Sequence, residues 1–231
     1  MLQKTFHIER NLKMAKHAKR RVQSPHVLGY TEEEIDDFRD HLVMHLGDIG
    51  DHFLHDKASL CGIHIDIVPV QPIGEGPFFK NSFHMVTMGA GAYLMPDGDR
   101  AEYVITLPST WPMDMKSWQD ERNYWPIRLL QDAARFPVTN KTSLDWFHTL
   151  DNQEPYSVDT QQCACVFMPM PGFGFVQLSS GKTIKILQIV PIYRSELDMC
   201  KKIGNGIAIF DLIRCLGDSP LAISPQRPPC A

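Results

Sequence analysis

The segment that decides the fold runs from Ile186 to Gly206 and reads ILQIVPIYRSELDMCKKIGNG. Its first residues are almost continuously apolar, which is typical of a strand buried on both faces of a sheet. Pro191 breaks this run, and the polar residues that follow favour a helix with Ser195 as N-cap and Asp198 three residues later. The segment therefore predicts a central strand that leads directly into a helix.

Upstream of this segment, the expected strands come in groups and do not alternate with helices. A capping box from Thr31 to Glu34 begins one helix, and a second helix is expected over residues 121–136, before Pro137. Apolar patterns predict six strands, over residues 61–70, 83–91, 101–107, 163–171, 172–178 and 182–192, and a last helix over 208–216. This order predicts an α+β fold, in which a mixed or antiparallel sheet is flanked by helices.

Charge divides the chain of 231 residues into a basic N-terminal part and an acidic remainder. Residues 1–30 hold seven Lys/Arg and one Glu, whereas the remainder holds 16 Lys/Arg and 26 Asp/Glu. We expect a basic N-terminal arm over residues 1–30, one domain over 31–225 and a loose proline-rich tail over 226–231. The acidic body disfavours nucleic acid and anionic membranes as partners and favours cationic ones.

The absence of two kinds of apolar segment bears on the cellular location of the protein. No stretch approaches the roughly 20 apolar residues that span a bilayer, and the N-terminus has no apolar signal-peptide core. A cytoplasmic protein is therefore expected, with its six cysteines as thiols. The basic arm leaves open a nucleic-acid-associated regulator, although it carries no reading motif.

A search for catalytic motifs gives one enzyme hypothesis. The sequence has no phosphate loop, dinucleotide fingerprint, zinc-protease motif or serine-hydrolase elbow. His64 and Asp66 leave the same face of an expected strand, so a metal-dependent hydrolase or oxygenase that uses His64, Asp66 and His148 remains an alternative. Because spacing fixes no third ligand, we expect no catalytic residue, no metal and no cofactor.

Residues 141–160 form a long expected loop that mixes aromatic and charged side chains. Loops of this length inside a compact domain are often functional. Trp146 and Phe147 lie within it, as do Asp145, His148 and Asp151. The sequence therefore predicts a site in this loop, and Tyr193 and Glu196 are expected at the neighbouring sheet edge.

Three segments resemble the suppressor of fused family. They are WPIRLLQDAARF (residues 125–136), HTLDN (148–152) and ILQIVPIYRSELDMCKKIGNGIAIFDLI (186–213), and FHMVTMGAG (83–91) extends the likeness. The resemblance covers roughly residues 60–225 and implies a non-enzymatic protein-binding module. The animal member sequesters a transcription factor by clamping an extended peptide, whereas many single-domain bacterial members look like toxin-immunity proteins.

The resemblance also implies contact residues. The family's groove uses an aromatic side chain after an Ala-Arg pair, where Arg135 and Phe136 stand here. It uses a histidine just before Leu-Asp-Asn, which matches His148 and brings in Asp151, while Asp145 is a plausible counterpart of the groove's acid. We therefore expect a module that sequesters or neutralises a protein partner, such as a basic toxin domain.

Overall fold

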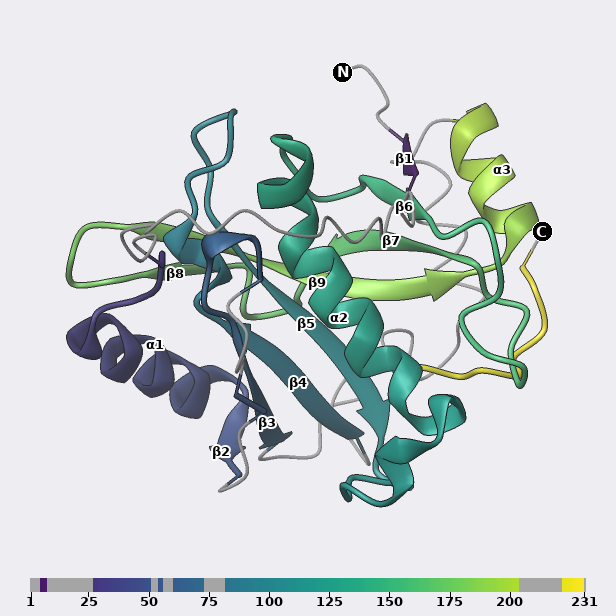
Figure 1. Cartoon of the computed structure of the whole chain (residues 1–231), viewed down its shortest axis with the longest axis horizontal. Helices are drawn as coiled ribbons and strands as arrows, with labels where there is room; N and C mark the ends of the chain where they lie inside the picture. The colour runs from purple at the N-terminus through teal and green to yellow at the C-terminus, as the bar shows by residue number, and fades with distance from the viewer. Residues whose placement is uncertain are drawn as a thin grey trace, which may run out of the picture.

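A nine-stranded mixed sheet organises the computed structural model, which describes residues 5–7, 27–50, 54–55, 60–72, 82–203 and 222–230 (Figure 1). The strands are β1 (Thr5–His7), β2 (Gly47–Ile49), β3 (Asp66–Pro72), β4 (Ser82–Met88), β5 (Ala101–Pro108), β6 (Thr149–Asp151), β7 (Ala164–Pro169), β8 (Phe175–Gln177) and β9 (Thr183–Ile192). Their order is β1-β6-β7-β9-β5-β4-β3-β2, and β8 also pairs with β9. The predicted α+β class is confirmed, and the predicted helix at 208–216 lies outside the described residues.

The predicted central strand is β9. It pairs in parallel with β5 and antiparallel with β7 and β8, and its residues 186–192 are all buried. The strand predicted over residues 182–192 is confirmed, and Pro191, which interrupts the apolar run, stays in β9 opposite Cys165. The Pro191 carbonyl faces away from β7 and accepts the Arg227 side chain, and the pairing with β5 has already ended at Ile189. Proline is tolerated there because no strand needs its missing N–H.

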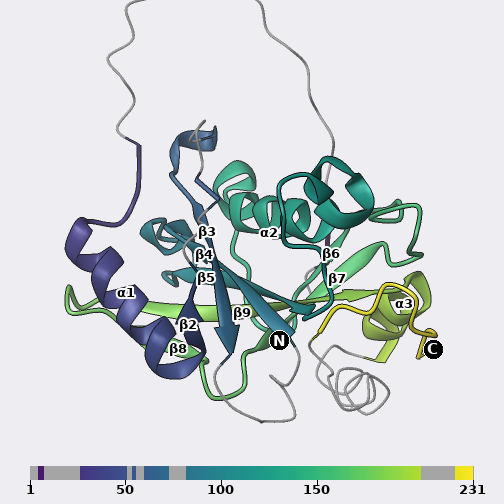
Figure 2. The ribbon, with the colours of Figure 1, turned by 90° about the horizontal axis from the view of Figure 1, so that it is seen from below.

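Among the described residues, the helices that cover the sheet are α1 (Glu32–His45), α2 (Glu121–Asn140) and α3 (Arg194–Ile203). Helix α2 packs on one face, while α1 and α3 lie on the other (Figure 2). The first core contains Trp125, Tyr103 and Phe167, and the second contains Phe38 and Leu197. Short 3-10 helices occur at η1 (Leu60–Gly62), η2 (Ala90–Ala92) and η3 (Ser117–Gln119). Each face of β9 therefore meets its own core.

The predicted start of α1 and the predicted end of α2 can be compared with the structure. The Thr31–Glu34 capping box is confirmed, since each residue's side chain accepts the other's backbone N–H. The predicted stop at Pro137 is wrong, because α2 continues to Asn140. Two side chains support its last turn by donating to carbonyls four residues back, from Thr139 to Arg135 and from Asn140 to Phe136.

The helix start at residue 195 also differs from expectation. Helix α3 begins at Arg194, so Ser195 lies inside its first turn and is not the N-cap. The Glu196 carboxylate accepts the backbone N–H of Tyr193 at 2.8 Å and satisfies the donor at the helix start. The predicted strand over residues 61–70 likewise starts later, because η1 occupies its first residues and β3 begins at Asp66.

Glu102 is a fully buried acid at the centre of the sheet. Its carboxylate accepts hydrogen bonds from the Thr87 hydroxyl at 2.6 Å and from the N–H groups of Gly89 and Gly91 at 2.8 and 2.9 Å. Burial raises the pKa of Glu102 to about 7, although these hydrogen bonds act in the opposite direction. Glu102 therefore fixes the turn that follows β4 and titrates near neutral pH.

Cysteine and membrane expectations can be checked in the described residues. Cys61, Cys163, Cys165 and Cys200 are free thiols, but Cys230 is disulfide-bonded, so the expectation of six thiols is wrong. None of the described helices is long and apolar enough to cross a membrane.

Candidate functional site

The predicted loop 141–160 is built around a short strand. Residues Thr149–Asp151 form β6, which pairs antiparallel with β7, so the expectation of a loop without regular structure is wrong for these residues. A tight turn precedes β6, in which the His148 N–H donates to the Asp145 carbonyl at 3.1 Å. The imidazole Nδ1 of His148 accepts the Asp145 N–H at 3.2 Å and closes the same turn from the side-chain direction.

Phe147 occupies a backbone position in this turn that favours glycine. Its φ is +68°, and 37% of the residue is exposed. The Phe147 N–H donates to the Phe167 carbonyl, and the Phe167 N–H donates to the His148 carbonyl. Two residues thus oppose one residue of β7, which is the G1 type of β-bulge, whose first residue is usually glycine. An aromatic residue in the left-handed region is strained, and such strain concentrates at functional sites.

Lys185 of β9 holds the turn against the sheet. Its ammonium donates to Asp99 at 2.5 Å and to Asp145 at 2.9 Å, and it lies 5.5 Å from the Trp146 ring centroid. Burial lowers the pKa of Lys185, but the hydrogen bonds to both carboxylates outweigh this effect and raise it. Trp146 also packs edge-on against Phe175, which is 53% exposed, at a centroid separation of 4.9 Å. The turn is therefore rigidly supported from β8 and β9.

Asp151 connects the loop to the strand–helix junction. The residue is 2% exposed, and its carboxylate forms a bidentate pair with Arg194 of α3, at 2.6 and 2.7 Å. Lys201 lies 3.7 Å away, and the Gln153 N–H donates to the same carboxylate. Burial raises the pKa of Asp151, but the hydrogen bonds from Arg194 and Gln153 outweigh it and lower the pKa. Asp151 thus acts first as an internal anchor.

Tyr193 and Glu196 form a second polar cluster with the C-terminal segment. Glu196 is completely buried and accepts both Arg227 nitrogens, at 2.5 and 2.6 Å, and the Cys230 N–H at 2.9 Å. The Arg227 guanidinium lies 4.9 Å from the Tyr193 ring centroid, and the Tyr193 hydroxyl donates to the Arg227 carbonyl. These contacts attach residues 227–230, which belong to the expected tail, to the start of α3.

The structure divides the predicted contact residues into two groups. Asp145 and His148 lie in the turn before β6 and Asp151 is the last residue of β6, and Arg194 links this strand to the junction that holds Tyr193 and Glu196. Phe136 is separate from them, because it is 6% exposed and packs in the core under α2. Arg135 lies on α2, whose Thr139 contacts Cys61 of η1.

Of the three residues in the metal hypothesis, only His64 and Asp66 meet in the structure. The His64 and Asp66 side chains do meet, at 3.1 Å, and the same carboxylate lies 3.2 Å from His55. His148 instead closes its own turn with Asp145. Within the described ranges, no group of three or more His, Cys, Asp or Glu side chains could hold a metal ion.

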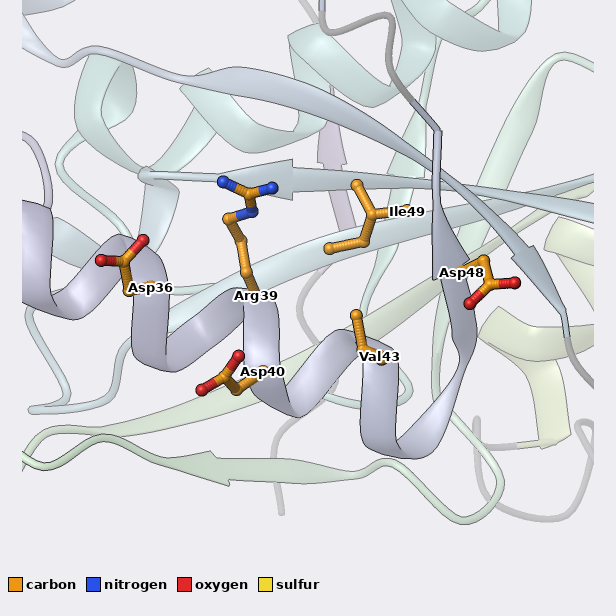
Figure 3. A pocket seen from close by; sticks show the side chains of 6 residues that line it. All are labelled: Asp36, Arg39, Asp40, Val43, Asp48 and Ile49. Atoms are coloured by element: carbon orange, nitrogen blue, oxygen red, sulfur yellow. The ribbon is translucent and has the colours of Figure 1, made fainter.

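A groove at the other end of the strand order, beside β2, involves none of the predicted contact residues. It lies between α1 and β2 and is lined by Asp36, Arg39, Asp40, Val43, Asp48 and Ile49 (Figure 3). The lining is mainly charged and open to solvent, and three of its side chains are carboxylates.

Comparison with known proteins identifies the family of the chain. The model of the suppressor of fused protein family matches residues 62–228, which is most of the chain. The chain belongs to the suppressor of fused family. No curated protein sequence matches the chain.

Solved structures of suppressor of fused proteins have the same fold. Sufu in the Sufu–Fu complex is 14% identical, with a TM-score of 0.64 over 85% of this chain and 91% of that chain. The putative suppressor of fused homologue of Neisseria gonorrhoeae FA 1090 is 13% identical, with a TM-score of 0.58 over 87% and 98%. Drosophila Suppressor of Fused is 13% identical, with a TM-score of 0.56 over 85% of this chain and 50% of that chain. The chain therefore spans half of the Drosophila protein.

Several residues of the site were not predicted from the sequence. Lys185, Arg194 and Arg227 hold the three important acids, and each lies at least 31 residues from its acid. Their charge alone could not have revealed this, because the sequence holds 23 Lys and Arg residues. Phe147 was noticed as a loop aromatic, but a positive φ at phenylalanine has no sequence signal, whereas a glycine there would have had one.

Proposed function

We propose that this suppressor of fused family member is a non-enzymatic protein-binding module whose contact surface is the turn surface, defined as Asp145–His148 together with Phe175. The observation that carries the proposal is Phe147. The Phe147 ring is exposed, and the backbone that carries it is strained. A ring that served only to fill the core would not require a left-handed backbone. A partner gains affinity from a rigid aromatic side chain, because little conformational entropy is lost on binding.

The surroundings of the turn support this role. Phe175 adds a second exposed aromatic ring, and Lys185 neutralises Asp145 while it holds the turn in place. Aromatic anchors surrounded by charged and polar groups are typical of protein–protein contact sites. The Sufu–Fu complex, whose Sufu chain has the same fold, is a protein–protein complex.

The finer proposal concerns the partner and the place of action. We infer a bacterial, cytoplasmic protein that sequesters or neutralises a basic partner by covering its surface, as a toxin-immunity protein would. The acidic balance after residue 30 supports a basic partner, and the likeness to the Neisseria gonorrhoeae homologue covers 98% of that chain. An acidic surface speeds association with a basic protein, and added salt slows it.

The test is an affinity capture from an extract of the source cells, with the wild-type chain beside Phe147→Gly. Glycine suits the left-handed backbone, so this variant keeps the turn and removes only the ring. Loss of a central aromatic contact should weaken binding of the recovered protein about 30-fold or more, as measured by calorimetry. A double variant at His148 and Asp151 is less suitable, because Asp151 anchors Arg194 and its loss would disturb folding.

The matched control is Val158→Ala. Val158 is 86% exposed and lies in the same long loop, outside the turn surface, so its loss should leave binding unchanged. Equal binding by wild type and Phe147→Gly would refute the turn surface as the contact site. The immunity proposal requires in addition that the recovered protein is toxic when produced alone and harmless when produced with this chain.

A further inference from the structure

Strand β2 forms one edge of the sheet, at the far end of the strand order from β1. The Gly50 N–H donates to the Pro69 carbonyl of β3 at 2.9 Å, and the next pair along the ladder is Ile49 with Val70. Hydrogen-bonded and non-hydrogen-bonded pairs alternate in an antiparallel ladder, so the N–H and C=O groups of Ile49 point away from β3. Neither group has a hydrogen-bond partner among the described residues. The edge of β2 therefore presents a donor and an acceptor that can pair with another chain.

A groove runs along this edge and has α1 as its second wall, as Figure 3 shows. The α1 residues that line it recur at spacings of three and four, which places them on one face of the helix: Asp36, Arg39, Asp40 and Val43. Val43 is 46% exposed, and Ile49 is half-buried in the opposite wall. The groove thus combines an open strand edge with apolar side chains, which are the two features that hold an added strand.

The α1 wall is held in place from its other side. Glu34 forms an ion pair with Lys182 at 2.6 Å, and the Asp37 carboxylate accepts the Ser179 N–H, so the first turns of the helix are tied to the segment between β8 and β9. The helix also leads directly into β2, which fixes the two walls relative to each other. A preformed groove loses little conformational entropy when a ligand binds.

Charge determines which strand the groove accepts. Its three carboxylates, Asp36, Asp40 and Asp48, have no hydrogen bond or ion pair within the described ranges. Arg39 adds one positive charge to these three negative ones, so the lining carries a net charge of −2. This charge attracts a basic segment and repels an acidic one. A second copy of this chain is a poor occupant, because pairing at this edge brings two acidic grooves together.

We propose that the β2 groove, defined by the six lining residues shown in Figure 3, is a docking site for an extended basic segment of a partner protein. The segment adds a strand to the sheet through hydrogen bonds to Ile49, and an apolar side chain packs on Val43. Its lysine or arginine side chains lie against the three carboxylates. The groove shares no residue with the turn surface, so this inference goes beyond the proposed function.

The experiment is an NMR titration of the full-length, isotope-labelled chain with a synthetic peptide. The probe is a capped hexapeptide in which lysine and valine alternate, and glutamate replaces lysine in the control peptide. The lysine peptide should shift the amide signal of Ile49 and slow its hydrogen exchange, because this N–H gains an acceptor. The glutamate peptide should leave the signal unchanged, because the groove repels it.

Two double variants separate the groove from the overall charge. Asp40→Asn/Asp48→Asn should weaken binding of the lysine peptide about three- to tenfold, because two exposed ion pairs are lost. The matched variant Glu154→Gln/Asp159→Asn also removes two exposed acids, but these lie outside the groove, so it should bind as wild type does.

Four results would overturn the proposal. The first is no binding of the lysine peptide, and the second is binding without a change at the Ile49 amide. The third is equal weakening by both double variants, which means that overall charge and not the groove attracts the peptide. The fourth is slow exchange of the Ile49 amide without peptide, which means that a second copy or another part of the chain already occupies the edge. Phe147→Gly should bind the lysine peptide as wild type does, so a failure of the turn surface leaves this test intact.

Discussion

The strain at Phe147 leads to a prediction that reverses a common order of stabilities. In most backbone positions, glycine is less stable than alanine by about 0.5–1 kcal/mol, because glycine loses more conformational freedom on folding. At a φ of +68°, alanine instead carries the left-handed cost of about 1–2 kcal/mol, which glycine avoids. Phe147→Gly should therefore be more stable than Phe147→Ala by about 0.5–1 kcal/mol.

Both variants also lose the buried part of the Phe147 side chain, and this loss lowers their stability relative to wild type. The Phe147 residue is 37% exposed, so about two thirds of its surface is buried, and its removal costs roughly 1–2 kcal/mol of the burial energy. The glycine variant should recover about half of this loss by relief of strain. For a chain of this length, the difference between the two variants corresponds to about 1–4 °C in Tm.

The assay is urea unfolding of both variants, with the free energy of unfolding taken from the midpoint at an unchanged slope. Phe175 supplies the matched control, because it is an exposed aromatic residue in β8, where an extended backbone restores the usual order of alanine above glycine. If alanine is at least as stable as glycine at position 147, the left-handed turn and the argument for a strained contact residue are both wrong.

Further predictions concern the buried charges. Arg227→Ala leaves the Glu196 carboxylate buried without its cation and should cost about 3–5 kcal/mol in urea unfolding, whereas Arg122→Ala removes only an exposed pair and should change the free energy of unfolding much less. The pKa of Glu102 is raised to about 7, so its contribution to stability is present below about pH 4.5 and is lost as pH rises through 7, by about 3 kcal/mol. Glu102→Gln should remove this loss. Burial lowers the pKa of His84 to about 4, so its contribution is lost as pH falls from about 6.5 to 4.

These predictions have clear contrary outcomes. Equal costs of the arginine substitutions would mean that the C-terminal segment is not held by a buried ion pair. Parallel stability curves of wild type and the glutamine variant between pH 5 and 8 would mean that the central acid does not titrate in this range. A variant that lacks the His84 imidazole, and whose stability still declines below pH 6 as that of wild type does, would refute the prediction for His84.

Local patterns were sufficient for the long elements. The apolar run at the start of the opening segment predicted β9, and the Thr31–Glu34 pair predicted the start of α1, because burial on both faces and helix capping are written in neighbouring residues. Strands β1, β2 and β6 were not predicted, because each has only three residues and, unlike the equally short β8, none lies in a longer apolar pattern. Pro137 was read as a stop, but side-chain hydrogen bonds kept the last helical turn.

The sequence by itself therefore determined the α+β class and the central strand, and it predicted a site in the loop over residues 141–160. The tertiary structure alone decided the state of each candidate residue: Asp151 is held by Arg194, Glu196 is buried under Arg227, and Phe147 is exposed on a strained turn. The physical reason is that ion pairs and strand pairing join residues far apart in the chain. Such contacts depend on how the sheet is assembled, and no local spacing records them.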